Sequence, residues 1–317
     1  MPTKLRIGTR GSPLALAQAH EVRDRLAAAH PDLAPGPDGA QPIEIVVIKT
    51  TGDRILDRPL AEIGGKGLFT KELDQALDEG DIDLCVHSMK DVPTLLPDNM
   101  VLAALLPRED PRDVWFARGG ETLSSLPAGS MVGTASLRRQ AQVLALRPDL
   151  RVSVLRGNVA TRLAKLERGE VDATMLALAG LNRLGHAVGD GSIVVEPSEI
   201  MPAVAQGAIG LQIRRSDEAT ALRVAALHCP GTGARVAMER GFLAALDGSC
   251  RTPIAGLAMI EDGRLAFAGL VAAPDGSRIE RIEGTSDPDN AAETGHDLGM
   301  ALRSRLPAGM LAHATGA

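Results

Sequence analysis

The sequence predicts an α/β protein with two similar lobes and a smaller C-terminal α+β domain. Short apolar strands alternate with helical patterns from Leu5 to about Arg183, which is typical of α/β folds. Several of these strands end in small, hydroxyl or basic residues directly before a helix start. From about Val224 the pattern changes to a helix, three alternating strands and a final helix. We expect residues 1-107 with 207-222 to form lobe 1, 112-201 to form lobe 2, and 226-317 to form the third domain.

The composition is that of an ordinary globular protein, because 44% of the 317 residues are hydrophobic and 23% are charged. Aromatic residues make up only 2%, which disfavours single-stranded nucleic-acid binding through stacked bases. The first residues contain no apolar run of signal-peptide length, and we see no membrane span, so we expect a cytoplasmic protein. The three cysteines are far apart and predict neither a disulfide framework nor a metal site.

The first lobe begins with a strand near Leu5 to Gly8, followed by a helix for which Ser12 is the expected N-cap and Pro13 the first residue. This turn is either an ordinary strand-to-helix connection or an anion site in which Arg10 assists the free backbone N–H groups. A second strand covers 43–48, a loop covers 50–66, and a helix covers about 68–77. Strands are also expected near 82–86 and 101–106.

The strand near 82–86 ends in Lys90, Asp91 and Pro93, and Pro93 cannot continue a central strand. Ligands of open α/β sheets bind at the carboxyl ends of the strands. Asp91 is therefore either a catalytic carboxylate or part of a surface turn with a local ion pair.

The second lobe repeats the strand, loop and helix pattern of the first. Strands are expected at 131–134, 152–155 and 173–177, with helices opening near Ala135, after Val159 and before Arg183. The segment 108–113 is expected to break the chain into a crossover, and 201–207 to form the return crossing. Two such lobes joined by crossovers predict a bilobal clamp around a ligand.

Arginine is concentrated in the second lobe. Six of the 34 basic residues of the chain are lysines, so 28 are arginines, and six arginines but only one acid lie between Thr134 and Arg162. Several of these arginines precede or open helices, where the dipole already favours anions. We therefore favour a polyanionic ligand over a solvated basic face. A nucleic acid is disfavoured by the net charge of −6.

Cys250 lies in a loop between Gly248 and Pro253, directly before Arg251. A neighbouring cation favours the thiolate, the reactive form. The alternative is an inert buried cysteine, and this alternative fits Cys85 well because Cys85 lies within a strand.

Nine segments together resemble the porphobilinogen deaminase family, in family order and over nearly the whole chain. They are Arg6 to Ala19 (RIGTRGSPLALAQA), Gly64 to Leu73 (GGKGLFTKEL), Val86 to Pro93 (VHSMKDVP), Arg108 to Asp113 (REDPRD), Val132 to Gln140 (VGTASLRRQ), Leu155 to Leu163 (LRGNVATRL), Leu176 to Gly185 (LALAGLNRLG), Pro202 to Gly210 (PAVAQGAIG) and Gly248 to Ile254 (GSCRTPI).

The resemblance implies an enzyme that joins four porphobilinogen molecules head to tail into hydroxymethylbilane with loss of ammonia. It implies a dipyrromethane cofactor bound through a thioether to Cys250, and Asp91 as the catalytic aspartate. It further implies two lobes like those of periplasmic binding proteins, a flexible lid over 50–66, and a monomer. The residues implied to bind cofactor or substrate carboxylates are Arg10, Ser12, Lys66, Lys90, Thr134, Ser136, Arg138, Arg139, Arg156, Arg162 and Arg183, with Gln206 lining the cleft at the crossing.

Two residues depart from the family pattern. Ala135 stands where the family commonly has serine, and Ala205 where it commonly has glycine. Neither touches Asp91, Cys250 or an arginine, so we expect activity to survive. The competing interpretations are a non-catalytic bilobal receptor for a small polyanion, which has no need of Cys250 or Asp91, and a nucleic-acid binder, whose affinity would fall steeply with salt.

Overall fold

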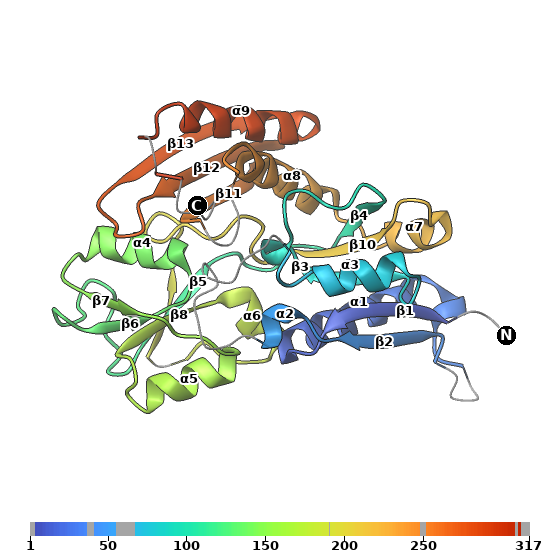
Figure 1. The fold of residues 1–317 in the computed structure, drawn as a ribbon, viewed down its shortest axis with the longest axis horizontal. Coiled ribbons are helices and arrows are strands. Elements are labelled where there is room, and N and C mark those ends of the chain that lie inside the picture. Colours follow the sequence, from blue (N-terminus) through green and yellow to red (C-terminus); the bar gives the residue numbers. More distant parts are fainter. Residues whose placement is uncertain are drawn as a thin grey trace. The chain divides into compact units, whose positions relative to one another are not determined.

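The computed structural model describes residues 4–36, 41–54, 67–189, 191–247, 252–307 and 310–311. These residues form two units, coloured along the chain in Figure 1. The first unit holds the described residues up to 108 together with 208–233, and the second unit holds 109–207 and the residues from 234 onward. Among the described residues, the chain therefore leaves the first unit after residue 108, returns at 208 and leaves it again after 233.

The first unit is built on a five-stranded sheet in the order β2-β1-β3-β10-β4. β1 runs parallel to β2 and β3, whereas β10 runs antiparallel to both of its neighbours. The carboxyl ends of β1 and β3 therefore share one edge of the sheet, where parallel strands place ligand sites. The strands are β1 (Leu5–Arg10), β2 (Ile43–Ile48), β3 (Leu84–Ser88), β4 (Met100–Leu105) and β10 (Ile209–Arg214).

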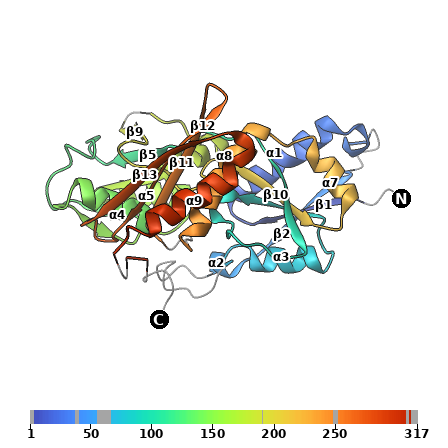
Figure 2. The ribbon, with the colours of Figure 1, turned by 90° about the horizontal axis from the view of Figure 1, so that it is seen from above.

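Helices cover both faces of this sheet (Figure 2). Val22 and Leu26 of α1 are fully buried in one core, and Leu73 and Leu77 of α3 are buried in another. This three-layer arrangement explains why the strands are apolar on both sides. The helical segments are α1 (Pro13–Ala29), η1 (Pro31–Leu33), α2 (Thr51–Arg54), α3 (Lys71–Asp78), η3 (Met89–Asp91) and α7 (Glu218–Ala225).

The second unit contains a five-stranded sheet with the same pattern, in the order β7-β6-β8-β5-β9. β6 runs parallel to β7 and β8, and β5 runs antiparallel to β8 and β9. The predicted repeat of the first lobe's architecture is thus confirmed. The strands are β5 (Asp113–Ala117), β6 (Met131–Gly133), β7 (Arg151–Ser153), β8 (Ala173–Ala177) and β9 (Ser192–Val195).

Helices again pack on both faces. Val143 of α4 (Leu137–Leu146) is buried with the apolar core around Trp115. On the other face, Leu181 of α6 (Leu178–Arg183) packs with residues that include Leu163 of α5 (Val159–Glu167). α4 is thereby held against one face of the sheet.

The third sheet, also in the second unit, is the antiparallel meander β11 (Ile254–Glu261), β12 (Arg264–Ala272) and β13 (Ile279–Ser286). Phe242 of α8 (Pro230–Ala245) meets Phe267 of the sheet with ring centroids 5.0 Å apart. Gly295 lets α9 (Ala291–Arg303) approach α8, because a Cβ at Gly295 would lie 2.0 Å from the Met238 carbonyl oxygen. A short η4 turn (Pro288–Asn290) precedes α9. The expected α+β pattern is confirmed.

Three strands differ from the prediction. β5, β9 and β10 were not expected, because 108–113 was interpreted only as a break and 201–207 only as a crossing. β5 starts at Asp113 itself, and Val114 and Trp115 are buried on opposite faces of the sheet. The helix expected from about residue 68 begins at Lys71. Most of the expected 50–66 lid lies outside the described residues.

Candidate functional site

The catalytic candidate Asp91 lies where β3 ends. The strand passes into the η3 turn, whose first residue, Met89, donates its N–H to the Ala208 carbonyl at 3.0 Å. Val92 N–H closes the turn on the Met89 carbonyl at 3.2 Å. Met89 itself is buried, whereas the Asp91 side chain is 30% exposed. The turn therefore anchors the backbone in the core and leaves the carboxylate accessible.

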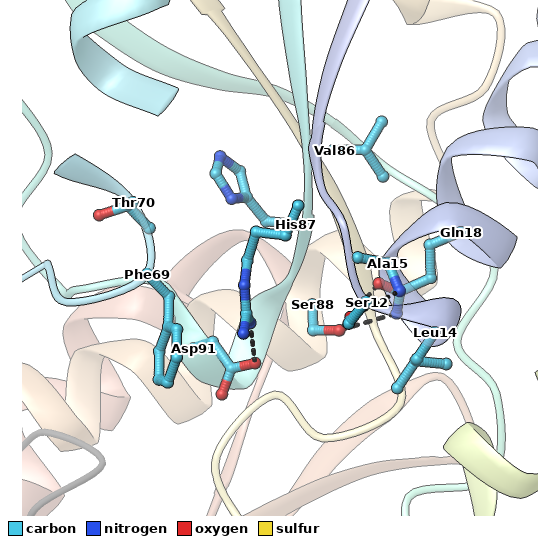
Figure 3. Close-up of a pocket in the computed structure, with 11 residues that line it drawn as sticks. Ser12, Leu14, Ala15, Gln18, Phe69, Thr70, Val86, His87, Ser88 and Asp91 are labelled. Atoms are coloured by element: carbon cyan, nitrogen blue, oxygen red, sulfur yellow. Dashed lines mark hydrogen bonds and ion pairs between the residues drawn. The ribbon is translucent and has the colours of Figure 1, made fainter. Parts of the chain in front are cut away.

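Arg10, the last residue of β1, forms an ion pair with Asp91, one of the pocket residues labelled in Figure 3. Its Nη1 lies 4.0 Å from Asp91 Oδ2, which is longer than a hydrogen bond. The guanidinium carbon lies 4.1 Å from the centroid of the Phe69 ring, within the range of a cation–π contact. Phe69 thus supports Arg10 from one side, and the Asp91 oxygens remain accessible to a third group.

The start of α1 forms another wall of the same site. Ser12 caps the helix, as predicted, by accepting the Ala15 N–H at 3.3 Å. Gln18 and Ser88 exchange side-chain hydrogen bonds of 2.8 and 2.9 Å, which fix α1 to the end of β3. These elements line an open pocket. Its polar lining includes Arg10, Ser12, Gln18, Thr70, His87, Ser88 and Asp91.

Behind this pocket lies a buried polar chain. His87 Nε2 donates to Gln212 Oε1 at 2.8 Å, and Gln212 Nε2 donates to Asp74 Oδ1 at 2.8 Å. Burial raises the pKa of Asp74 above its usual value. Cys85 is also buried, and burial raises the pKa of its thiol well above the ordinary value. The prediction that Cys85 is a buried core cysteine is confirmed, and its lack of reactivity stays a prediction.

In the second unit, Arg138 and Arg139 converge on a carboxylate that the sequence did not single out. Asp113 is fully buried, and both arginine side chains are about 5% exposed. Arg138 Nη2 donates to Asp113 Oδ2 at 2.8 Å, and Arg139 binds both carboxylate oxygens, through Nε at 3.1 Å and Nη2 at 2.8 Å. Burial alone would raise the pKa of Asp113, but the two guanidinium groups outweigh it and hold that pKa well below its usual range.

Gln206 completes this buried cluster. Its side chain is 1% exposed, and its Nε2 donates to Asp113 Oδ1 at 2.8 Å and to the Pro111 carbonyl at 2.6 Å. Gln206 therefore ties the return crossing to the outgoing crossing inside the second unit. Its ligand contact, predicted from the resemblance, stays a prediction.

The remaining predicted residues of the second unit lie in loops or near helix starts, except Arg183, which is the last residue of α6. Ser136 caps α4 by accepting the Arg139 N–H, and Thr134 Oγ1 accepts the Ser136 N–H at 3.1 Å. Arg162 Nε donates to the Gly157 carbonyl at 2.9 Å, and Arg183 Nη2 donates to the Gly207 carbonyl at 3.0 Å. Arg156 and, in the first unit, Lys90 are partly buried. Lys66 and Cys250 lie outside the described residues.

The structure thus brings Arg10, Ser12 and Asp91 together in the first unit. Thr134, Ser136, Arg138, Arg139 and Gln206 gather around the start of α4 in the second unit. Sequence reasoning missed Phe69 and Asp113 as parts of these groups. Both stand inside segments already quoted for the family resemblance, GGKGLFTKEL and REDPRD, but nothing in those segments says which arginine each side chain contacts.

Among the described residues, no cluster of three or more histidine, cysteine, aspartate or glutamate side chains could hold a metal ion. In the same part of the chain, every helix is too short or too polar to cross a membrane.

Comparison with known proteins gives a consistent result over most of the chain. Residues 5–222 match the family model described as "Porphobilinogen deaminase, dipyromethane cofactor binding domain", and 234–304 match "Porphobilinogen deaminase, C-terminal domain". The chloroplastic porphobilinogen deaminase of Oryza sativa subsp. japonica is 55% identical over 96% of this chain and 85% of its own length. The porphobilinogen deaminase of Paracoccus denitrificans is 54% identical over 96% of this chain and 95% of its own length.

Solved structures add little to this result. The periplasmic aliphatic sulphonate binding protein SsuA from Escherichia coli covers 78% of this chain and 71% of its own, with 16% identity and a TM-score of 0.39. A similarity this low carries no argument, so the description of two α/β lobes relies on the two sheets themselves.

The matched family models and relatives define a transferase. The chain belongs to the porphobilinogen deaminase family, which polymerises porphobilinogen into hydroxymethylbilane in tetrapyrrole biosynthesis. The family's first domain is a dipyrromethane cofactor binding domain, and here it corresponds to residues 5–222.

Proposed function

We propose that Asp91 is the catalytic carboxylate of this enzyme and that Arg10 and Ser12 bind a carboxylate of the ligand beside it. The observation that carries the proposal is the Arg10–Asp91 pair, 4.0 Å apart in an open pocket at the ends of two parallel strands. At this distance the Arg10 guanidinium and the Asp91 carboxylate orient each other, but neither group uses its full hydrogen-bonding capacity on the other. It therefore provides an anion and a cation at one place for a substrate that carries charges of both signs.

The chemistry of the substrate fits this pair. Porphobilinogen carries an acetate, a propionate and an aminomethyl group on a pyrrole ring. The aminomethyl group is protonated when it leaves, so ammonia departs with the electrons of the C–N bond and positive charge develops on the methylene carbon and the ring. The Asp91 carboxylate stabilises that charge electrostatically, holds the pyrrole N–H, and accepts the proton released after the next ring has been attacked. Arg10 meanwhile binds a substrate carboxylate.

We further propose that Cys250 holds dipyrromethane through a thioether. The donors present fit such a polyanion: within the described part of the chain the Arg138 Nε is buried without a hydrogen-bond partner, and Ser12, Ser136 and Asn158 cap three helix starts. When bound, the cofactor supplies the pyrrole carbon to which the first substrate unit is joined. The residues proposed to hold its carboxylates and those of the growing chain are Arg10, Ser12, Lys66, Lys90, Thr134, Ser136, Arg138, Arg139, Arg156, Arg162 and Arg183, with Gln206 beside them.

The proposal also includes three domains, with 226-317 separate from lobe 2, and a cytoplasmic monomer. The separate sheet of β11 to β13, with its own core around Phe242, supports the third domain. Sedimentation of the purified chain tests the monomer, because a dimer would have twice the 33.1 kDa mass.

Turnover of porphobilinogen by Asp91→Asn tests the catalytic role. Asn keeps the shape and removes the charge, so we expect kcat to fall by at least about 100-fold. Asp83→Asn is the matched control, because Asp83 also pairs with an arginine, Arg6 at 2.8 Å, and lies directly before the same strand. Near-normal turnover in Asp91→Asn, or an equal loss in Asp83→Asn, would reject the assignment.

Intact mass of the purified chain tests the attachment site. We expect the wild type to exceed its sequence mass by one dipyrromethane and Cys250→Ser to show the bare mass. Cys229→Ser, which changes a cysteine of the first unit, should keep the extra mass. If Cys250→Ser retained the added mass, the attachment would have to lie elsewhere.

A further inference from the structure

The Asp113 carboxylate is saturated with hydrogen bonds. Asp113 Oδ2 accepts from Arg138 Nη2 and Arg139 Nε, and Oδ1 accepts from Arg139 Nη2 and Gln206 Nε2, all between 2.8 and 3.1 Å. Asp113 is the first residue of β5, which is paired on both sides by β8 and β9. The carboxylate is therefore a fixed point to which both guanidinium groups are attached.

Each arginine has a second fixed contact. Arg138 Nη1 donates to the Met201 carbonyl at 2.6 Å, and Arg139 Nη1 donates to the Met175 carbonyl at 2.9 Å. A guanidinium held through two nitrogens by two separate acceptors cannot rotate about its axis. Both groups are thus oriented before any ligand arrives, which is the condition for tight binding at low entropic cost.

Stability alone does not account for this arrangement. Burying two cations with one anion leaves a net positive charge inside the unit, and desolvation of buried ion pairs commonly offsets their attraction. Burial also lowers the pKa of Arg138, even beside Asp113. The Arg138 Nε remains buried without a partner, so one donor of this cluster is left unsatisfied in the described residues. The one excess positive charge and the unused Arg138 Nε donor together favour the binding of an anionic ligand.

We infer that Asp113 is a positioning residue for anion binding: it holds Arg138 and Arg139 in the orientation in which they receive a carboxylate of the cofactor or the growing chain. Gln206 supports the carboxylate from the return crossing. This inference depends on the proposed function, because it assigns to Asp113 an effect exerted through two proposed ligand-binding arginines.

A double-mutant cycle on the full-length enzyme tests the inference. The variants are Asp113→Asn, Arg139→Gln and the double variant, each assayed for the KM and kcat of porphobilinogen, for Tm, and by intact mass for the fraction that carries the cofactor. We expect Asp113→Asn to raise KM about tenfold and to lower cofactor occupancy. In the Arg139→Gln background, Asp113→Asn should raise KM by a clearly smaller factor than it does in the wild type, because one of the two arginines through which it acts is gone.

Asp149→Asn is the matched control, because Asp149 binds Arg147 at the other end of α4 with a similar geometry, 2.8 and 2.6 Å, but on the surface. Its KM and occupancy should equal those of the wild type. If Asp113→Asn does not fold, Asp113→Glu decides, since it keeps the charge and displaces the carboxylate by one methylene. We expect a raised KM in that variant.

The outcomes distinguish failure of the Asp113 inference from failure of the proposed role of Arg139. A folded Asp113→Asn or Asp113→Glu with wild-type KM and only a lower Tm overturns the inference, as does a double variant whose KM rises by the product of the single effects. An Arg139→Gln variant with wild-type KM and occupancy overturns the proposed role of Arg139, and the inference with it.

Discussion

The two five-stranded sheets have equivalent strand orders, yet the key carboxylate beside each sheet lies in a different environment. In the first sheet, Asp91 is 30% exposed and its arginine partner stands 4.0 Å away, supported by an aromatic ring. In the second sheet, Asp113 is fully buried and binds two arginines at 2.8 Å. The same architecture thus carries one carboxylate that is accessible to a ligand and another that is enclosed by its partners.

The difference shows that the environment, not the residue type, decides the function of a carboxylate. A buried carboxylate with all lone pairs engaged has no capacity left for a substrate proton, but it can orient its partners. A partly exposed carboxylate at the end of a strand has that capacity. Three predictions test this contrast, and a fourth concerns the return crossing of the second unit.

The largest expected difference is in stability. Asp113→Asn leaves two buried arginines without their anion, so we expect the free energy of unfolding to fall by about 3–5 kcal/mol. Asp91→Asn removes a partly exposed carboxylate with one distant partner and should change stability by less than about 0.5 kcal/mol. Urea denaturation of both variants measures the contrast. Equal losses in the two variants would contradict it.

Most of the secondary structure was predictable, because the strands and helices carry their own periodicity and caps. Ser12 and Ser136 were readable as helix starts, and both act as N-caps. β5 was missed because its first residue, Asp113, is charged, and a buried charge in a strand is explained only by partners far along the chain. Arg138 and Arg139 lie 25 and 26 residues away from it.

The candidate site was predictable only in part, because local sequence patterns locate some of its residues and not others. The position of Asp91 follows from a local rule, since strand ends of parallel sheets carry functional residues. The packing of Phe69 against Arg10 and the burial of Gln206 against Asp113 join distant segments. No local pattern encodes these contacts, so they required the fold.

The second prediction concerns Arg10. Arg10→Gln removes the cation that faces Asp91 and the charged contact with the Phe69 ring. Loss of a charge-assisted contact of about 1.5–3 kcal/mol corresponds to a rise in KM of about 10–150-fold. Steady-state kinetics measure this change. Arg25→Gln, which breaks a surface pair with Glu21 on α1, serves as the control and should leave KM unchanged.

The third prediction uses pH to separate the two carboxylates. The folded-state pKa of Asp113 is lowered below the ordinary value of 3.8, so its stabilising effect is fully present above that value and is lost as the pH falls toward the folded-state pKa. The stability difference between wild type and Asp113→Asn should therefore be constant from pH 8 to about pH 5 and shrink below about pH 4. Denaturation at a series of pH values measures it, and a difference that grows on acidification would contradict the ion cluster.

The smallest expected effect lies at the return crossing, where the second unit departs from the family pattern. Ala205 has a φ of +58°, a left-handed conformation that costs an alanine about 1–2 kcal/mol. Its N–H is held there by Glu239 Oε2 at 2.6 Å, and Glu239 Oε1 also accepts the Ala258 N–H at 2.8 Å. The strain is therefore maintained by a buried carboxylate that joins the crossing to the third sheet.

Ala205→Gly relieves this strain, but it also frees the unfolded chain and removes a buried methyl, losses of about 0.4–1 and about 0.8 kcal/mol. These terms nearly cancel, so we expect stability to change by less than about 0.5 kcal/mol. Ala203→Gly, at a neighbouring position without positive φ, has no strain to relieve and should cost about 1 kcal/mol. Thermal unfolding of the two variants compares them directly. An equal loss at both positions would mean that the crossing does not strain Ala205, and that glycine is not needed there for backbone geometry.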